Sequence, residues 1–184
     1  MPAADERQLI LDVQEGSHDA FRLLVERYMK QAYNVAYGFL HDHDDAEDVA
    51  QESFVRVYRS IKTFRGDAEF GTWLYRIVMN LSLNRAQQRR TSRVRTVESF
   101  EPIENFVGHD PAGSQDPDVR WHIERALHQL PTLQRATVIL RHLNGLSTKQ
   151  VSGVLGCSEG TVKTHLHRGL KKMKTMLSFL KGEL

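Results

Sequence analysis

Apolar residues recur three and four positions apart along much of the chain, which is the spacing of one buried face of an α-helix. The first such run comprises Phe21, Leu24, Val25, Tyr28, Ala32, Val35, Ala36 and Phe39. The polar stretch HDHDDAED at residues 41–48 then interrupts the pattern, and Asp44 or Asp45 is suited to cap a new helix. That second helix is expected to bury Val49, Phe54, Val57, Tyr58 and Ile61 and to expose Asp48, Gln51, Glu52 and Arg56.

A loop and a long linker divide the rest of the pattern. Residues 64–72, FRGDAEFGT, contain two glycines and no helical period, and helical spacing resumes over residues 73–90 with Trp73, Ile77 and Leu81 facing inward. Residues 93–118 contain prolines, glycines and acidic side chains without any sustained period, which is typical of a flexible linker. We therefore expect two domains, residues 1–92 and residues 119–184.

The second domain carries the signals of a helix-turn-helix. Ser147 and Gln150 fit a capping box, Gly156 permits a tight turn, and Ser158 is placed to cap the final helix. A short helix followed by a turn and a second helix is the arrangement that places its second helix in the major groove of DNA. Because no segment shows the alternation of a strand, the expected fold is all-α, with two small helical domains and a helix-turn-helix in the second.

The final helix has two different faces. Its apolar positions, which are expected to pack, are Val162, Leu166, Leu170, Met173 and Leu177, and its outward positions are Gly160, Thr164, His167, Arg168 and Lys171. Arg168 is suited to a bidentate contact with guanine, whereas Lys163, Lys171 and Lys172 can reach phosphates or bases. The alternative is a basic, solvated helix that ends a bundle.

Charge is distributed unevenly along the chain, although the net charge is only +2. Residues 1–61 carry −6, residues 62–95 carry +6, residues 96–118 carry −6 and residues 119–184 carry +8. Two basic blocks separated by an acidic spacer indicate two surfaces that meet a polyanion, and an acidic first third indicates a face for a basic partner. Solvated faces without a partner are the alternative interpretation.

Composition excludes several classes of protein. Cys157 is the only cysteine, so an internal disulfide is impossible and a zinc site has too few thiolates. No apolar stretch is long enough to cross a bilayer, and the first residues lack the pattern of a secretory signal. We expect a cytoplasmic protein that does not insert into a membrane.

The basic helix over residues 73–90 offers a weaker signal. Asn80 and Asn84 lie one turn apart on one face, where their amides could read a base edge. Aromatic residues around the preceding loop could stack on unpaired bases, although Phe64 and Trp73 fit a place in the core better on composition alone.

Two longer segments resemble a known family. DAEDVAQESFVRVYRSIKTFRGDAEFGTWLYRIVMN, residues 45–80, resembles the polymerase-binding and promoter-melting segment of extracytoplasmic-function sigma factors of the sigma-70 family. LPTLQRATVILRHLNGLSTKQVSGVLGCSEGTVKTHLHRG, residues 130–169, resembles their helix-turn-helix domain. The resemblance extends from about Ala20 to Lys172.

The resemblance implies a function and a set of site residues. It implies that the chain binds core RNA polymerase, directs it to promoter DNA and is controlled by an anti-sigma factor. The implied polymerase contacts are Asp48, Gln51, Glu52 and Val55. The implied contacts to the minus-ten element are Arg65, Phe70, Trp73, Arg76, Asn80 and Asn84. The implied contacts to the minus-thirty-five element are Ser158, Glu159, Gly160, Thr161, Lys163, Thr164, His167, Arg168 and Lys171. His165 departs from the family, because it stands where arginine is common.

Other functions remain as alternatives. An activator or repressor would need a sensor domain, which usually shows alternating strands and helices, and a metal-dependent nuclease would need its acids to converge. His41 and His43, with the neighbouring aspartates, fit a polar turn better than a metal site. We therefore expect no enzymatic activity, no cofactor, no metal and no small-molecule substrate.

Overall fold

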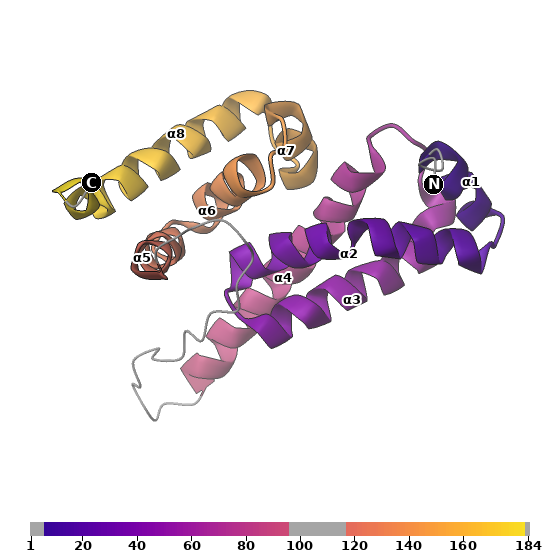
Figure 1. Ribbon diagram of the computed structural model, residues 1–184, viewed down its shortest axis with the longest axis horizontal. Helices are drawn as coiled ribbons and strands as arrows, with labels where there is room; N and C mark the ends of the chain where they lie inside the picture. Colours follow the sequence, from indigo (N-terminus) through magenta and orange to yellow (C-terminus); the bar gives the residue numbers. More distant parts are fainter. Residues whose placement is uncertain (1–5, 96–116, 183–184) are drawn as a thin grey trace.

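The computed structural model describes residues 6–95 and 117–182, and every regular element within those ranges is helical, as Figure 1 shows. The elements in chain order are α1 (Glu6–Gln14), α2 (His18–Leu40), α3 (His43–Ser60), the 3-10 turn η1 (Ile61–Thr63), α4 (Phe70–Arg95), α5 (Pro117–His128), α6 (Thr132–Val138), the π-helical turn η2 (Ile139–Leu143), α7 (Thr148–Leu155), α8 (Glu159–Met176) and the 3-10 turn η3 (Ser178–Gly182). The all-α prediction is confirmed. Helices α4 and α5 both extend into the predicted linker, and residues 96–116 lie outside the described part.

Helices α2, α3 and α4 bury their apolar faces against one another. Alanines 32, 36, 46 and 50 are at most 1% exposed, so the backbones of α2 and α3 approach closely. Tyr58, which the pattern placed inside, is 44% exposed and packs its ring edge-on against Phe21 at the surface. In α4 Leu81 is buried as predicted, whereas Trp73 and Ile77 are only partly buried and their neighbours Leu74 and Val78 are fully buried, so the inward face at the start of the helix is displaced by one residue from the prediction.

Helix α1 was not predicted from the sequence. It buries Leu9, Ile10 and Val13 against α2, and the hydroxyl of Tyr28 donates a hydrogen bond to a carboxylate oxygen of Glu6. With nine residues it shows too few turns for its three apolar positions to stand out as a period.

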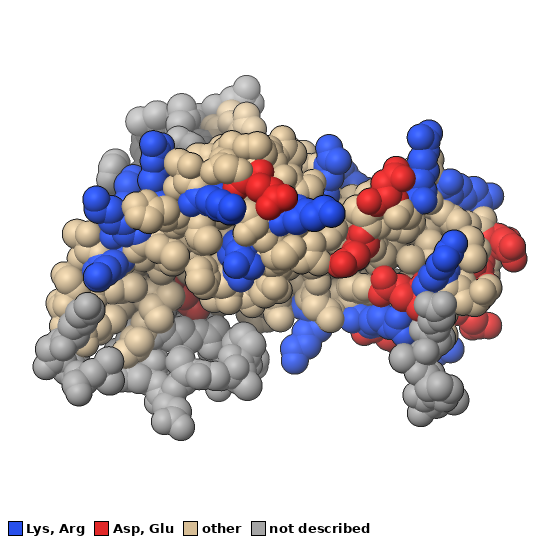
Figure 2. Space-filling model, turned by 90° about the horizontal axis from the view of Figure 1, so that it is seen from above, with Lys and Arg blue, Asp and Glu red and all other residues tan. Residues whose placement is uncertain are grey.

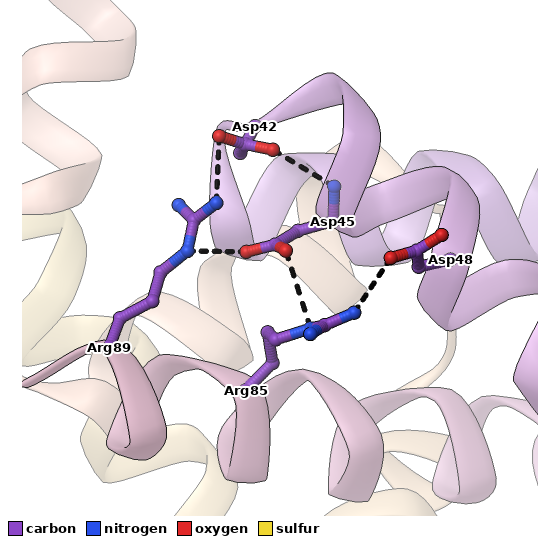
Figure 3. Close-up of polar contacts among 5 residues, drawn as sticks. All are labelled: Asp42, Asp45, Asp48, Arg85 and Arg89. Atoms are coloured by element: carbon purple, nitrogen blue, oxygen red, sulfur yellow. Dashed lines mark hydrogen bonds and ion pairs between the residues drawn. The ribbon is translucent and has the colours of Figure 1, made fainter. Parts of the chain in front are cut away.

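A cluster of ion pairs joins the start of α3 to α4 (Figure 3). Asp42, rather than Asp44 or Asp45, is the N-cap of α3, and its side chain accepts from the amide N–H of Asp45 at 2.9 Å. Arg89 binds Asp42 at 2.8 Å and also the buried carboxylate of Asp45, which Arg85 reaches at 3.3 Å. The guanidinium groups of α4 therefore neutralise the aspartates that α3 places against it.

We call residues 6–95 the first unit and residues 117–182 the second unit. In the second unit, α6 packs across α8 at a glycine. A Cβ on Gly169 would lie 3.0 Å from a methyl group of Val138, so the two helices touch here through backbone. Leu170, which was predicted to pack, is 39% exposed, because Gly169 occupies the inward position of that turn. Leu166 and Met173 complete the packing against Leu127, Leu130 and Val138.

The two units are in contact and share an apolar core. A Cβ on Gly38 of α2 would lie 3.2 Å from Ile139 of η2, and one on Gly153 of α7 would lie 3.3 Å from Thr72 of α4. Gln150 donates to Glu69 at 2.6 Å, next to the same contact. In Figure 1 α6 and α7 accordingly lie alongside α2 and α4. We call this packing the closed arrangement.

Within residues 6–95 and 117–182, no helix has both the length and the apolar character that crossing a membrane requires.

Replacing Asp42 tests the ion-pair cluster. Partial burial alone would raise the pKa of Asp42, but the amide of Asp45 and the guanidinium of Arg89 outweigh it and hold the pKa below 3.8. Asp42→Ala is expected to lower the free energy of unfolding by about 1 to 2 kcal/mol at pH 7, because a cap and an ion pair are lost. Urea denaturation measures the change.

Asp42→Asn is the matched control, because asparagine caps equally well but carries no charge. The free energy of unfolding of Asp42→Asn should be lower than that of the parent chain above pH 3.8, the ordinary pKa of the carboxyl group. This difference should vanish as the pH falls through the lower pKa that Asp42 has in the folded protein. A deficit that stays constant down to pH 2 would contradict the assigned ion pair.

Candidate functional site

The helix-turn-helix forms through the predicted caps. Ser147 accepts from the amide of Gln150 at 3.2 Å, and the side chain of Gln150 accepts from the amide of Ser147 at 2.7 Å. Helix α7 ends at Gly156, whose φ of 64° lies in the left-handed region that glycine adopts without strain. Ser158 then accepts from the amide of Thr161 at 3.1 Å and starts α8. Each of these local predictions is confirmed.

Helix α8 exposes a basic face. Val162 and Gly169 are buried, which turns the opposite side of the helix to solvent. Exposed on it are Glu159, Gly160, Lys163, Thr164, His167, Arg168 and Lys171, and Ser158 is exposed at its cap. Thr161 is partly buried. Figure 2 shows lysine and arginine side chains spread over the left half of the view, where α8 lies in Figure 1. This face has the shape and charge of a major-groove reader.

His165 does not lie on this face. Its ring is partly buried, unlike the exposed ring of His167 two positions later. The departure of this residue from the family pattern therefore concerns the packing of α8 more than its exposed surface.

Helix α4 leaves one narrow stripe in solvent. Between Phe70 and Asn84 the only exposed side chains are Arg76, Asn80 and Asn84, spaced by one turn. Asn80 also lines a hollow of about 360 Å³ with Arg56, Arg59, Ser60 and Ile77. Arg56 and Arg59 are not among the site residues predicted from the sequence. Their spacing of three residues on the exposed face of α3 could have indicated a basic surface there. Only the fold shows that this face meets Asn80.

The loop before α4 combines an exposed arginine with a cluster of packed aromatic rings. Arg65 is exposed, whereas Trp73 is partly buried with its ring centroid 5.0 Å from that of Phe64. Phe70 is only 1% exposed and packs against Tyr28, with ring centroids 5.1 Å apart. The ring of Phe70 is part of the core in this arrangement, so contact with a base would require the ring to leave this packing.

The acidic side of α3 combines charge with an apolar residue. Gln51, Glu52 and Val55 are exposed, Val55 by 47%, and Glu52 accepts from Arg56 at 2.7 Å. Asp48 is exposed too, but Arg85 of α4 binds it at 2.8 Å. Protein interfaces usually combine an apolar centre with a polar rim, and Val55 between Gln51 and Glu52 offers both kinds of side chain.

Among the described residues, no three or more histidine, cysteine, aspartate or glutamate side chains are grouped so that they could hold a metal ion. His41 is the left-handed C-cap of α2, with its amide donating to Tyr37, and His43 lies against the ring of Tyr33. Both histidines thus have positions in the turn between α2 and α3.

Family models match both units of the chain. The model of Sigma-70 region 2 matches residues 24–92, and that of Sigma-70 region 4 matches residues 120–173. The chain is 35% identical to the RNA polymerase sigma-H factor of Pseudomonas aeruginosa, covering 97% of this chain and 96% of that protein. It is 31% identical to the ECF RNA polymerase sigma factor SigW of Bacillus subtilis, covering 93% and 96%. It is 33% identical to the ECF RNA polymerase sigma-E factor of Escherichia coli, covering 89% of each.

Two solved structures share the fold. CnrH, solved in complex with the cytosolic domain of CnrY, superposes with a TM-score of 0.69 at 24% identity and covers 94% of this chain and 97% of CnrH. The sigma factor RpoE of Bartonella quintana, solved with the anti-sigma factor NepR, gives a TM-score of 0.72 at 23% identity and covers 86% of this chain and 96% of that one.

The turn at Gly156 can be tested by substitution. Gly156→Ala places a Cβ in the left-handed region and is expected to lower the free energy of unfolding by about 1 kcal/mol. Gly160→Ala is the control, because Gly160 is helical and exposed, so that alanine should be neutral or stabilising by up to about 1 kcal/mol. Urea denaturation of both variants measures whether Gly156→Ala is the less stable of the two. Equal free energies of unfolding would argue against the left-handed turn at Gly156.

Proposed function

The chain belongs to the extracytoplasmic-function group of sigma-70 family RNA polymerase sigma factors, and on that basis we propose that it binds core RNA polymerase and carries it to promoters with two separate elements. The observation that carries the proposal is α8, which follows a capped turn and exposes Lys163, Arg168 and Lys171 opposite a buried face. A helix with these features is suited to direct readout in the major groove.

We propose that three surfaces of the chain each bind a different partner. The exposed face of α3, with Asp48, Gln51, Glu52 and Val55, docks on core polymerase. The exposed face of α8 reads the minus-thirty-five element. Arg65, Trp73, Arg76, Asn80 and Asn84 contact the minus-ten element, together with Arg56 and Arg59 at the hollow beside Asn80. Phe70 supports this surface from the core.

Melting in this proposal needs no chemistry. Unstacking a base costs a few kcal/mol, which a pocket that binds the unpaired base can offset. The hollow beside Asn80 joins two guanidinium groups, an amide and an apolar side chain, which are groups that bind a phosphate and a base together. The chain thus acts by binding, has no catalytic activity of its own, and works in the cytoplasm, where transcription takes place.

We further propose control by an anti-sigma factor, which membership of the family implies. The composition of residues 93–118 supports this proposal, because prolines, glycines and acidic side chains without a helical period are typical of a flexible linker.

The closed arrangement is too short for both promoter elements. Elements centred ten and thirty-five base pairs upstream lie about 25 base pairs apart, which is about 85 Å of duplex at about 3.4 Å per base pair. In the closed arrangement α7 packs directly on α4, at the roughly 8 to 10 Å usual for packed helices, and α8 starts at Glu159, directly after the turn that ends α7. Because α8 has 18 residues and is only about 27 Å long, its exposed face lies much less than about 85 Å from α4. The linker of residues 96–116 can reach about 70 Å when extended, at about 3.3 to 3.6 Å per residue. We infer that the two units separate when the chain works on a promoter.

Run-off transcription with purified core polymerase and a library of promoter sequences tests the function. A sigma factor makes transcripts start at a defined set of library members. An ordinary activator instead binds promoter duplex tightly by itself, and addition of core polymerase changes neither its affinity nor its sites. That second outcome would replace the proposal.

Two substitutions should separate the surfaces. Arg168→Ala is expected to lose about 1 to 3 kcal/mol of discrimination at the upstream element, because a bidentate contact to guanine is removed. Glu52→Ala should weaken polymerase docking and leave base preference at the minus-thirty-five element intact, because the partner that Glu52 loses, Arg56, lies on the minus-ten side. Binding to core polymerase and transcription from substituted promoters measure the two effects. If Glu52→Ala docks as tightly as the parent chain, the docking face is elsewhere.

A cross-link tests the separation of the two units. Thr72→Cys with Gly153→Cys, in a Cys157→Ser chain, should form a disulfide, since a Cβ at Gly153 would lie 3.3 Å from the Thr72 side chain. The oxidised double variant is expected to lose promoter-directed transcription and to regain it on reduction. Each single variant, treated with the same oxidant, is the control. Full activity of the cross-linked chain would show that the closed arrangement suffices.

A further inference from the structure

A side chain of α1 holds the backbone that enters the loop before α4. We call residues 64–69 the minus-ten loop. The amide of Gln14 donates to the carbonyl oxygens of Ile61 and Phe64, each at 2.8 Å. A glutamine amide has two N–H donors, so both are used on backbone groups of a segment far away along the chain.

The two carbonyls lie where the chain changes direction. Ile61 also accepts from the amide of Phe64, which closes η1, and Phe64 is extended at φ −72° and ψ 115°. Gly66 then turns the chain with a φ of 78°. Because Gln14 fixes the peptide carbonyl that directly precedes Arg65, it sets the direction in which Arg65 leaves the protein surface.

The other end of the loop is fixed by packing. Phe70 lies buried against Tyr28 and Trp73, and the ring of Phe64 packs on both Phe70 and Trp73. The residues in between, Arg65 to Glu69, are exposed. The loop is therefore an exposed arch on two anchored ends, one of which depends on Gln14.

Helix α1 has anchors other than Gln14. Leu9, Ile10 and Val13 are at most 9% exposed, and Tyr28 donates to Glu6 at the opposite end of the helix. Removal of the Gln14 amide should therefore release the loop without releasing the helix.

We propose that Gln14 is a positioning residue for promoter melting, because it holds the minus-ten loop in the conformation that receives an unpaired base. The inference rests on the proposed function of that loop. It assigns α1, which carries none of the predicted contacts, to the promoter-melting machinery.

The test compares two positions on the same helix. Gln14→Met keeps the length of the side chain and removes both donors, whereas Gln14→Lys restores a donor. Gln8→Met and Gln8→Lys are matched controls, because Gln8 is exposed and its amide donates to Asp12 one turn away on the same helix, at 2.8 Å. The full chain is assembled with core polymerase on the strongest promoter from the run-off library. Base unpairing is followed by 2-aminopurine fluorescence within the minus-ten element.

Gln14→Met is expected to lower open-complex formation about tenfold, since two hydrogen bonds of ordinary net strength are lost. Core polymerase affinity should be unchanged, and Gln14→Lys should recover most of the loss. Amide exchange should rise in residues 64–69 and stay constant in α1. Both Gln8 variants should match the parent chain.

Three results would overturn the proposal. The first is parent-level melting by Gln14→Met, and the second is an equal loss by Gln8→Met. The third is faster amide exchange throughout α1 in Gln14→Met, since Gln14 would then only hold α1 in place. A Gln14→Met chain that fails to fold counts as this third result, unless Gln14→Lys folds and unpairs the minus-ten element at the parent level. If the parent chain itself gives no transcript, the proposed function fails instead, which keeps the two conclusions apart.

Discussion

The structure depends on the burial of α4 from several sides. Its first half packs against α2 and α3 through Leu74, Val78 and Leu81, and Thr72 turns toward α7. A helix enclosed in this way has little surface left for polar residues. The stripe of Arg76, Asn80 and Asn84 is therefore set as much by what the neighbouring helices cover as by the choice of residues.

The same packing decides which charges are free. Asp42 and Asp45 carry negative charge toward α4, where an unpaired buried carboxylate would be costly, and Arg85 and Arg89 neutralise them. Part of the negative charge in the first third of the chain is thus neutralised by ion pairs within the fold. In the middle of α3, Glu52 and Val55 stay in solvent, and the carboxylate of Glu52 pairs with Arg56 of the same helix.

The closed arrangement links the two units through small residues. Glycines at positions 38 and 153 let η2 and α7 approach α2 and α4 closely, and a larger side chain at either position would have to displace its neighbour. These close contacts continue into an apolar core that the two units share through Ile139, Leu140 and Val151. Gln150 has two roles at this interface, because it caps α7 and also donates a hydrogen bond to Glu69, the last residue of the minus-ten loop.

The sequence by itself determined the helices other than α1, the capping box at Ser147, the turn at Gly156 and the exposed face of α8, because these depend on residues within about one helical turn of each other. Tertiary structure decided which aspartate caps α3, that Phe70 and Gly169 point inward, and that Arg56 and Arg59 meet Asn80. It also decided that Gln14 reaches the carbonyls of Ile61 and Phe64 and that α7 rests on α4. The physical reason is that these outcomes depend on which faces compete for the same buried space, and that competition joins residues far apart in the chain.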